Sequence, residues 1–415
     1  MTTANSAGAG KKWELLGWLF LTFFFYYGDR AIFGILLSPM AESLEISASE
    51  LGLVNTLMFG AIAVMLPLAG HAGDSFNRKR VIIFSLVAWS LGTLLTGAAM
   101  SLTVLILFRS LLTGCGESFY TPAAYSLLAE HHRESRGRAM AIHQAALYLG
   151  VIASGVAGGW IARQWGWRWV YFIFGGVGLL LAVGMARRLE PDAPRPRRAG
   201  ALRAMSAGLG ALWRSPAARV YCGSFAVIVC LVNAYITWAP RLLQARLGLD
   251  AGAAGVQAMT WHHAAALVAV IIGGWIADRL VREHASARVA LMLGAQLALM
   301  LCLWWTGSAA GRWSVYAAIT ALGLARGLYE CNTHASLFDV IPAELRASAV
   351  SVFAMIAFLV GSLTPWAFGR LAEAYGMAEG LSLGFRSLAG LSGLAALGLA
   401  YVLLVPSARV REKAW

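Results

Sequence analysis

The sequence is poor in charge. Only 13% of its 415 residues are Asp, Glu, Lys or Arg, about half of the roughly 25% that soluble domains carry. Hydrophobic residues make up 59% of the chain, and the mean hydropathy is +0.67. This composition excludes an ordinary soluble domain and predicts a chain that lies in lipid.

Cysteine is also scarce, and no catalytic or metal-binding motif is present. Five cysteines fall within apolar segments, without a CxxC pair or a His-Cys metal spacing. They are interpreted as small buried hydrophobic residues. The sequence has no Walker motif and no set of nucleophile, base and metal ligands. We therefore expect no metal, no cofactor and no enzymatic activity.

Apolar runs of about twenty residues recur along the chain, the length that crosses roughly 30 Å of hydrocarbon. They predict an all-α membrane protein with twelve transmembrane helices. The predicted spans are 14–37, 51–70, 81–100, 103–127, 138–162, 168–187, 218–240, 256–277, 288–308, 313–336, 347–371 and 385–406.

The net charge of +13 is explained by its distribution over the loops. Loops assigned to one side hold Lys11, Lys12, Arg78, Lys79, Arg80, Arg133, Arg136, Arg138, the linker arginines 187–214, Arg279, Arg282, Arg288, Arg346, Arg409, Arg411 and Lys413. The other side holds Arg163, Arg168, Arg241, Arg246, Arg312 and Arg386. The positive-inside rule then predicts an inner (plasma) membrane protein with both termini cytoplasmic, and nucleic-acid binding is not expected.

A polar stretch rich in Pro and Arg divides the predicted spans six and six. It predicts an N-terminal six-helix bundle over 1–187, a cytoplasmic linker over 188–215 and a C-terminal six-helix bundle over 216–415. The halves also look alike, because a Gly-x-x-x-Asp stretch ending at Asp74 is echoed by the Gly-rich stretch ending at Asp278. This similarity suggests an internal repeat.

These features resemble the major facilitator superfamily of transporters. The loop with Gly70, Asp74, Arg78 and Lys79 is similar to the signature between helices two and three of that family, with Ser75 and Asn77 at positions where the family usually has Arg and Gly. Asp278 and Arg279 repeat the pattern in the second half. The resemblance implies that these residues form a gating motif that holds one alternating-access state. A solvated anchor at the membrane surface is the simpler interpretation.

Three further stretches resemble two branches of that superfamily. They run from Tyr27 to Arg30, from Arg109 to Glu117 and from Tyr120 to Pro122. The two branches are the anion:cation symporters, which move sugar acids and other carboxylates with protons, and the spinster-like transporters, which are linked to lysolipids and sphingolipids.

Four charges fall near the middle of predicted spans one and four. An isolated charge at that depth costs at least about 2.5 to 3.5 kcal/mol, so each needs a partner on another helix. Asp29 with Arg109, and Arg30 with Glu117, balance two carboxylates against two guanidinium groups. A purely structural role, in which the four residues join helices one and four, stays open.

The resemblance assigns transport roles to the same four residues. Asp29 and Glu117 are the candidate proton carriers, while Arg30 and Arg109 are candidate clamps for a substrate anion. Arg109 and Glu117 are eight residues apart, where the family has seven, and the extra residue rotates Glu117 by about 100° on an α-helix. A bulge near Gly114 or Gly116 would restore the alignment.

Other polar residues are expected to line a substrate cavity. They are Tyr26, Tyr120, Gln144, Tyr148, Asn233, Arg326, Glu330 and Asn332. Arg326 and Glu330 stand at i and i+4 on one helix, so a structural pair along that helix is an equal alternative. His262 and His263 are expected at the membrane interface, near the outer end of their helix.

The function expected from these residues is proton-coupled symport of a small organic anion by alternating access. The partners are then the anion, protons and the lipid bilayer, and we expect a monomer. A spinster-like exporter of lysolipids or sphingolipids is the alternative. A non-transporting membrane sensor is a third possibility, which the absence of an added signalling domain does not favour.

Overall fold

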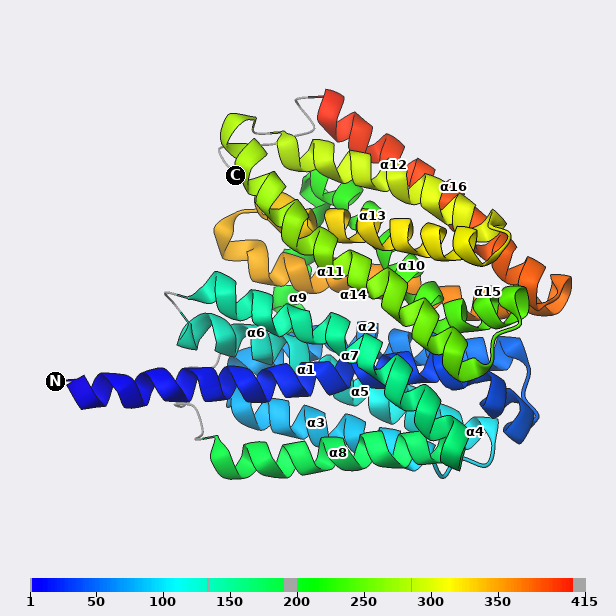
Figure 1. Cartoon of the computed structure of the whole chain (residues 1–415). Coiled ribbons are helices and arrows are strands. Elements are labelled where there is room, and N and C mark those ends of the chain that lie inside the picture. Colours follow the sequence, from blue (N-terminus) through cyan, green and yellow to red (C-terminus); the bar gives the residue numbers. More distant parts are fainter. Residues whose placement is uncertain (1, 133–134, 190–199, 285, 406–415) are drawn as a thin grey trace.

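The structure is a computed structural model that describes residues 2–132, 135–189, 200–284 and 286–405. Every regular element in these ranges is a helix (Figure 1). The helices of the first half of the chain are α1 (Thr2–Leu44), α2 (Ala48–Ser75), α3 (Arg78–Thr96), α4 (Leu102–Leu105), η1 (Ile106–Leu112), α5 (Thr113–Ser118), α6 (Tyr120–His131), α7 (Arg136–Trp165) and α8 (Trp167–Arg188).

The second half follows the same pattern of long helices. Its elements are α9 (Ala201–Arg214), α10 (Pro216–Leu247), α11 (Ala251–Glu283), α12 (Ala287–Ser308), α13 (Arg312–Phe338), η2 (Ala343–Leu345), α14 (Arg346–Ser362), α15 (Thr364–Tyr375) and α16 (Met377–Leu404). The segments α4, η1, α5 and α6 follow one another as a single broken span, and α14 with α15 forms another.

Eleven of these helices or helix runs are long and apolar enough to cross a membrane. The remaining long helix, α13, spans 27 residues, but Arg326 and Glu330 make its centre more polar. The prediction of an all-α membrane protein is confirmed. The predicted spans were shorter than the helices at most ends, because apolar character fades at the membrane surface while the helices continue past it.

Single glycines make two of the tightest helix connections. Gly166 joins α7 to α8 with φ of +87°, and Gly376 joins α15 to α16 with φ of +83°. A side chain is strained at such angles, whereas glycine is not. The two turns occupy equivalent places in the two halves, between the fifth and sixth spans of each, which supports the internal repeat.

Two faces of the helical assembly can be distinguished by the ends of the chain. The start of α1 and the end of α16 lie on one face, here named the terminal face, while the connection between α1 and α2 lies on the other, here named the opposite face (Figure 1). The two halves of the chain pack closely at the opposite face. There Asn55 of α2 donates to Thr237 of α10 at 2.8 Å, and the main chain of Ser49 donates to Glu373 of α15 at 2.8 Å.

Backbone contacts reinforce this closure. A Cβ added to Gly34 of α1 would lie 2.0 Å from the carbonyl oxygen of Ile236 in α10, so the two helix backbones touch where only glycine fits. Towards the terminal face the described parts of α6 and α13 do not pack extensively against each other. α2 and α14 do pack against each other, and a Cβ added to Gly70 would lie 3.5 Å from Ser351 of α14, so the halves also meet towards this face.

The linker between the halves contains an element that the sequence did not predict. Its composition predicts a polar cytoplasmic linker with no helix assigned, and residues 201–214 of it form helix α9. Ala211 and Leu212 are buried on one side of it, whereas Leu202 and Trp213 are exposed on the other. The helix packs against α14 and, to a smaller extent, against α2 and α10. The arginines 195, 197 and 198 lie outside the described residues.

Candidate functional site

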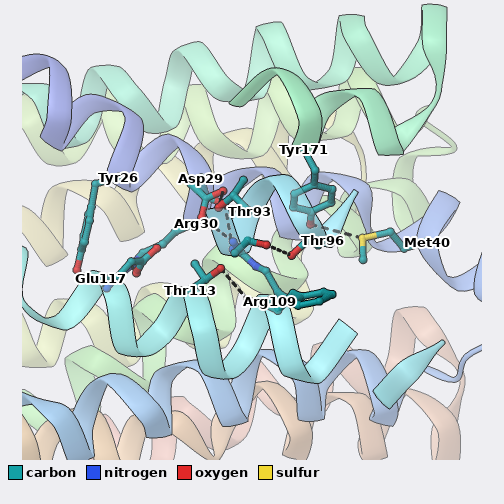
Figure 2. A network of polar contacts seen from close by, with 12 residues as sticks. Tyr26, Asp29, Arg30, Met40, Thr93, Thr96, Arg109, Thr113, Glu117 and Tyr171 are labelled. Atoms are coloured by element: carbon teal, nitrogen blue, oxygen red, sulfur yellow. Dashed lines mark hydrogen bonds and ion pairs between the residues drawn. The ribbon is translucent and has the colours of Figure 1, made fainter. Parts of the chain in front are cut away.

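Asp29 and Arg109 form the most enclosed ion pair of the site (Figure 2). Arg109 Nη1 lies 2.6 Å from Asp29 Oδ2, and Thr93 of α3 donates to Asp29 Oδ1 at 2.9 Å. Arg109 Nη2 also donates to the main-chain oxygen of Asp29 at 3.0 Å. The side chains are 0% and 3% exposed. The predicted pairing is confirmed, and it joins α1, α3 and η1.

Arg30 and Glu117 form a second ion pair one residue further along α1. Arg30 Nε lies 2.7 Å from Glu117 Oε2, and Arg30 Nη2 donates to the hydroxyl of Tyr26. This pairing was also predicted. Glu117 is fully buried, and its other oxygen, Oε1, has no hydrogen-bond partner among the described residues. A buried carboxylate oxygen without a donor is costly when the group is charged, and it is a place where a proton can be held.

A π-helix explains how the unusual spacing on the fourth span is tolerated. Residues 106–112 form η1, in which Thr113 N donates to Phe108 O, five residues earlier. The hydroxyl of Thr113 also donates to Phe108 O at 2.9 Å. A π-turn accommodates one extra residue, so the offset of eight positions from Arg109 to Glu117 covers about the rotation of an offset of seven on an α-helix. Both side chains therefore reach α1.

The position of this insertion differs from the expected one. A bulge was expected near Gly114 or Gly116, whereas the wide turn lies just before them. The two glycines instead allow close packing, because a Cβ at Gly114 would lie 2.7 Å from Met58 O and one at Gly116 would lie 2.6 Å from Trp89 N.

The second half contributes a third ion pair. Arg326 Nε lies 2.8 Å from Glu330 Oε1 within α13, so the two residues do pair along their own helix. The pair also makes bonds beyond α13. Arg326 Nη1 lies 3.2 Å from His262 Nε2 of α11, and Tyr148 of α7 donates to Glu330 Oε2 at 3.3 Å. The last bond joins the two halves of the chain.

Tyrosines lie between the ion pairs of the two halves. The phenol of Tyr27 is within electrostatic range of Arg30 and Glu117 on one side and of Arg326 and Glu330 on the other. The pairs Arg30–Glu117 and Arg326–Glu330 therefore belong to one region, which aromatic hydroxyl groups bridge. Gln144 belongs to the same region. Tyr125 of α6 donates to Gln144 Oε1 at 2.8 Å and also interacts electrostatically with Glu330.

Three other predicted lining residues are placed less directly. Tyr120 is buried among aromatic rings, where its hydroxyl donates to Leu19 O at 2.8 Å and lies 2.9 Å from His143 Nε2. Asn233 and Asn332 are buried. Asn332 Oδ1 and Asn233 Nδ2 have no hydrogen-bond partner among the described residues, so each retains one polar atom that could serve a ligand.

The residues predicted to form a gating motif lie at the terminal face in both halves. Arg78 Nε donates to Gly73 O at 3.0 Å, and its Nη1 lies 3.0 Å from Glu130 of α6. Lys79 follows and is partly buried. A Cβ at Gly70 would lie 3.5 Å from Ser351 of the second half. The side chain of Asp74 lies outside the described residues.

In the second copy of the motif, two ion pairs that share Arg288 connect the ends of three helices. Asp278 at the end of α11 lies 3.3 Å from Arg288 of α12, which in turn lies 3.6 Å from Asp339 after α13. Arg279 stands over the ring of Trp275 at 5.9 Å. The motif residues thus tie neighbouring helices together, and Glu130, Arg288 and Asp339 are partners that the sequence interpretation did not name.

One expectation about histidines is wrong. His262 and His263 were expected at the membrane interface, but both are buried. His262 stacks on Tyr235 with ring centroids 4.0 Å apart and binds Arg326. Trp261, by contrast, is 40% exposed. Three consecutive residues of a helix point in different directions, so the run Trp261–His263 carries one lipid-facing ring and two interior ones.

The chain matches the profile of a known transporter family. The Major Facilitator Superfamily profile matches residues 19–365, which is most of the chain. The chain belongs to the major facilitator superfamily. Its two six-helix bundles are therefore those of the major facilitator fold, as the sequence predicted.

Relatives and solved structures agree with this assignment. A D-galactonate transporter of Escherichia coli O6:H1 is 27% identical over 436 residues, which cover 97% of each chain. An MFS-type efflux pump of Mycolicibacterium smegmatis is 27% identical over 411 residues, covering 97% of this chain and 91% of that protein. A bacterial homologue of the human lysosomal transporter Spinster, solved in an inward-facing conformation, superposes with a TM-score of 0.79 at 18% identity. It covers 97% of this chain and 99% of its own.

The protein is therefore a membrane transporter of the major facilitator superfamily and not an enzyme. The polar site described above lies among the spans of both of its halves.

Proposed function

We propose that the protein is a proton-coupled symporter of a small organic anion, a carboxylate or sugar acid, that works by alternating access. The observation that carries the proposal is the state of Glu117. It is a fully buried carboxylate with one oxygen on Arg30 and the other without a partner among the described residues. An anion that drew Arg30 away would leave Glu117 uncompensated, and uptake of a proton at Oε1 would restore neutrality.

Asp29 is the weaker of the two candidate proton carriers. Both of its carboxylate oxygens have a donor, from Arg109 and from Thr93. A proton added to either oxygen would displace one of these donors. In the proposal Asp29 and Arg109 hold α1 against the fourth span, and Glu117 is the group that gains and loses the proton.

The substrate class follows from two arginines on opposite halves. Among the described residues, none accepts a hydrogen bond from Arg30 Nη1 or Arg326 Nη2. Guanidinium groups suit carboxylates through directed N–H donors. Tyr27, Tyr148 and Gln144 add hydroxyl and amide groups that match a polyhydroxy acid. The printed name of the Escherichia coli relative, a D-galactonate transporter, supports the same class.

The topology completes the proposal. Residues 1–187 and 216–415 act as the two rocking halves, joined by the linker 188–215, in a monomer. Basic residues gather on the terminal face, among them Lys11, Arg80 and Arg282. The positive-inside rule then predicts that the protein lies in the plasma membrane with both termini in the cytoplasm.

Uptake into proteoliposomes tests the proposal. Purified protein is reconstituted, a pH gradient is imposed, and accumulation of labelled D-galactonate and other sugar acids is measured. Glu117→Gln is expected to lower gradient-driven accumulation strongly while exchange of labelled for unlabelled substrate across the membrane continues, because Glu117 in the variant can no longer gain or lose a proton. Glu379→Gln, at the exposed pair with Arg386, is the matched control.

Two outcomes would contradict the proposal. Normal gradient-driven accumulation by Glu117→Gln would remove Glu117 from proton coupling. Binding of lysolipid, with no binding or transport of any carboxylate, would favour the spinster-like alternative.

A further inference from the structure

Glu330 is less enclosed by the surrounding side chains than the other two carboxylates near the middle of the spans. The side chains of Asp29 and Glu117 are 3% and 0% exposed, whereas that of Glu330 is 24% exposed. Glu330 is therefore the least enclosed of the three carboxylates. Glu330 also pairs with Arg326, which is 5% exposed.

The bonds around Arg326 fix the orientation of its guanidinium group. Its Nε binds Glu330, and its Nη1 binds His262 Nε2. His262 Nε2 must accept this bond, because an arginine nitrogen can only donate. The other ring nitrogen, Nδ1, lies 3.3 Å from Ile319 O and must donate to it. His262 is therefore neutral, and no described residue accepts a hydrogen bond from Arg326 Nη2.

An entering anion meets a conflict at this site. Arg326 attracts it, but the carboxylate of Glu330 on the same guanidinium group repels it. The conflict disappears if Glu330 gains a proton as the anion binds. The charges then balance, since Arg326 and the anion form a neutral pair beside a neutral carboxylic acid. The acid proton of Glu330 can donate to the Tyr148 oxygen, so the link between the halves survives with its donor and acceptor exchanged.

We propose that Glu330 is a displaceable counter-ion of Arg326, which takes up a proton from water when an organic anion binds Arg326 and so gives the second half its own coupling carboxylate. This inference rests on the proposed function. It adds a second protonation site, on α13, to the one at Glu117.

The other groups around Glu330 do not take this role. On α13 itself, the neighbours of Glu330 are Arg326, Cys331 and His334. Three phenols from the first half also lie near it, those of Tyr148 on α7, Tyr27 on α1 and Tyr125 on α6. His262 of α11 and Tyr235 of α10 interact with Arg326, the partner of Glu330. A proton added to His262 Nε2 would face the Arg326 guanidinium directly. Phenols are protonated at neutral pH. The carboxylate is thus the group that can change charge as an anion arrives.

Binding measurements on the detergent-purified protein test the inference. D-galactonate and other sugar acids are titrated by calorimetry between pH 6 and 8, and proton uptake per bound anion is followed with a pH-sensitive dye in weak buffer. The wild type is expected to lose affinity as pH rises, by up to about tenfold per pH unit for each coupled proton. Glu330→Gln is expected to bind more tightly than the wild type at pH 8 and to take up about one proton fewer.

Further variants separate this role from a structural one. Glu330→Asp keeps a carboxylate and is expected to retain the proton uptake, whereas Glu379→Gln should match the wild type in every measurement. If Glu330→Gln does not fold, Glu117→Gln gives the answer, because it should still take up a proton on binding through Glu330. Loss of all proton uptake in Glu117→Gln, or unchanged uptake in Glu330→Gln, would overturn the inference alone. Failure of the wild type to bind any carboxylate would overturn the proposed function as well.

Discussion

The guanidinium group of Arg109 donates hydrogen bonds to both the side chain and the main chain of Asp29. Nη1 lies 2.6 Å from the carboxylate, and Nη2 donates to the Asp29 carbonyl oxygen at 3.0 Å. The acceptor of the second bond is a main-chain carbonyl in the middle of α1. One guanidinium group therefore holds the backbone of α1 in place and also balances the charge of the Asp29 carboxylate. This pair is a structural joint between the first and fourth spans.

Asp29→Asn is therefore expected to destabilise the fold and not only to slow transport. The change leaves Arg109 buried without a compensating charge, and breaking one partner of a buried pair costs about 3 to 5 kcal/mol. Thermal unfolding of the purified protein in detergent should show a clear drop in Tm. The matched control is Glu379→Gln, whose exposed pair is worth at most about 1 kcal/mol. Equal unfolding temperatures for the two variants would contradict this account.

The π-helix gives a prediction about chain length. Deleting Leu111 shortens the offset from Arg109 to Glu117 to seven positions, so an ordinary α-helix would keep both side chains on α1, and folding is expected to survive. Inserting one alanine between Cys115 and Gly116 rotates the residues after it relative to Arg109 by about 100° and separates Glu117 from Arg30, with a loss of about 3 to 5 kcal/mol. Thermal unfolding of both variants is the measurement. An equal loss in the two would show that the wide turn is not what aligns the pair.

Gly34→Ala is expected to open the opposite face. The added methyl group would lie 2.0 Å from Ile236 O, so α1 and α10 must separate there. A cysteine placed at Asn55, in a background without the five native cysteines, should react faster with a membrane-impermeant thiol reagent when Gly34→Ala is present. Gly17→Ala is the control, because a Cβ at Gly17 meets nothing within 4 Å. Equal labelling in the two would contradict the expected separation.

Acid is expected to loosen the start of α1 through His132. The ring lies between the Lys12 carbonyl oxygen and the Ser135 hydroxyl, at 3.0 and 3.1 Å, and burial lowers the pKa of His132 below its ordinary value of 6.5. Below about pH 6.5 the unfolded chain binds more protons at this residue than the folded one, so the free energy of unfolding falls as pH decreases. Tm should fall between pH 7 and 5.5 by more in the wild type than in His132→Gln. A larger fall in His132→Gln would contradict the direction of this shift.

Charge balance predicted the centre of the site well. Two carboxylates and two guanidinium groups at membrane depth can be neutralised in few ways, and the pairs of Asp29 with Arg109 and of Arg30 with Glu117 follow from that count. Helix number and order follow equally from apolar length, because lipid leaves the backbone few alternatives.

Features that depend on contacts between helices could not be predicted in the same way. His262 is polar in sequence, and its burial depends on Arg326 and Tyr235, which come from other helices. The wide turn at residues 106–112 was expected at the neighbouring glycines because a sequence shows the extra residue but not which turn absorbs it. Helix α9 was missed because the Pro and Arg content of its surroundings outweighed the apolar face of Ala211 and Leu212.

The matching one-residue turns at Gly166 and Gly376 bear on how such a chain can arise. Each half crosses the bilayer an even number of times and so returns to the side from which it started. A tandem copy of the first half would then insert in the same direction as the original, with its basic loops already on the correct side. Duplication of one ancestral half needs no inversion of topology, and the two glycine turns are what such an event would leave behind.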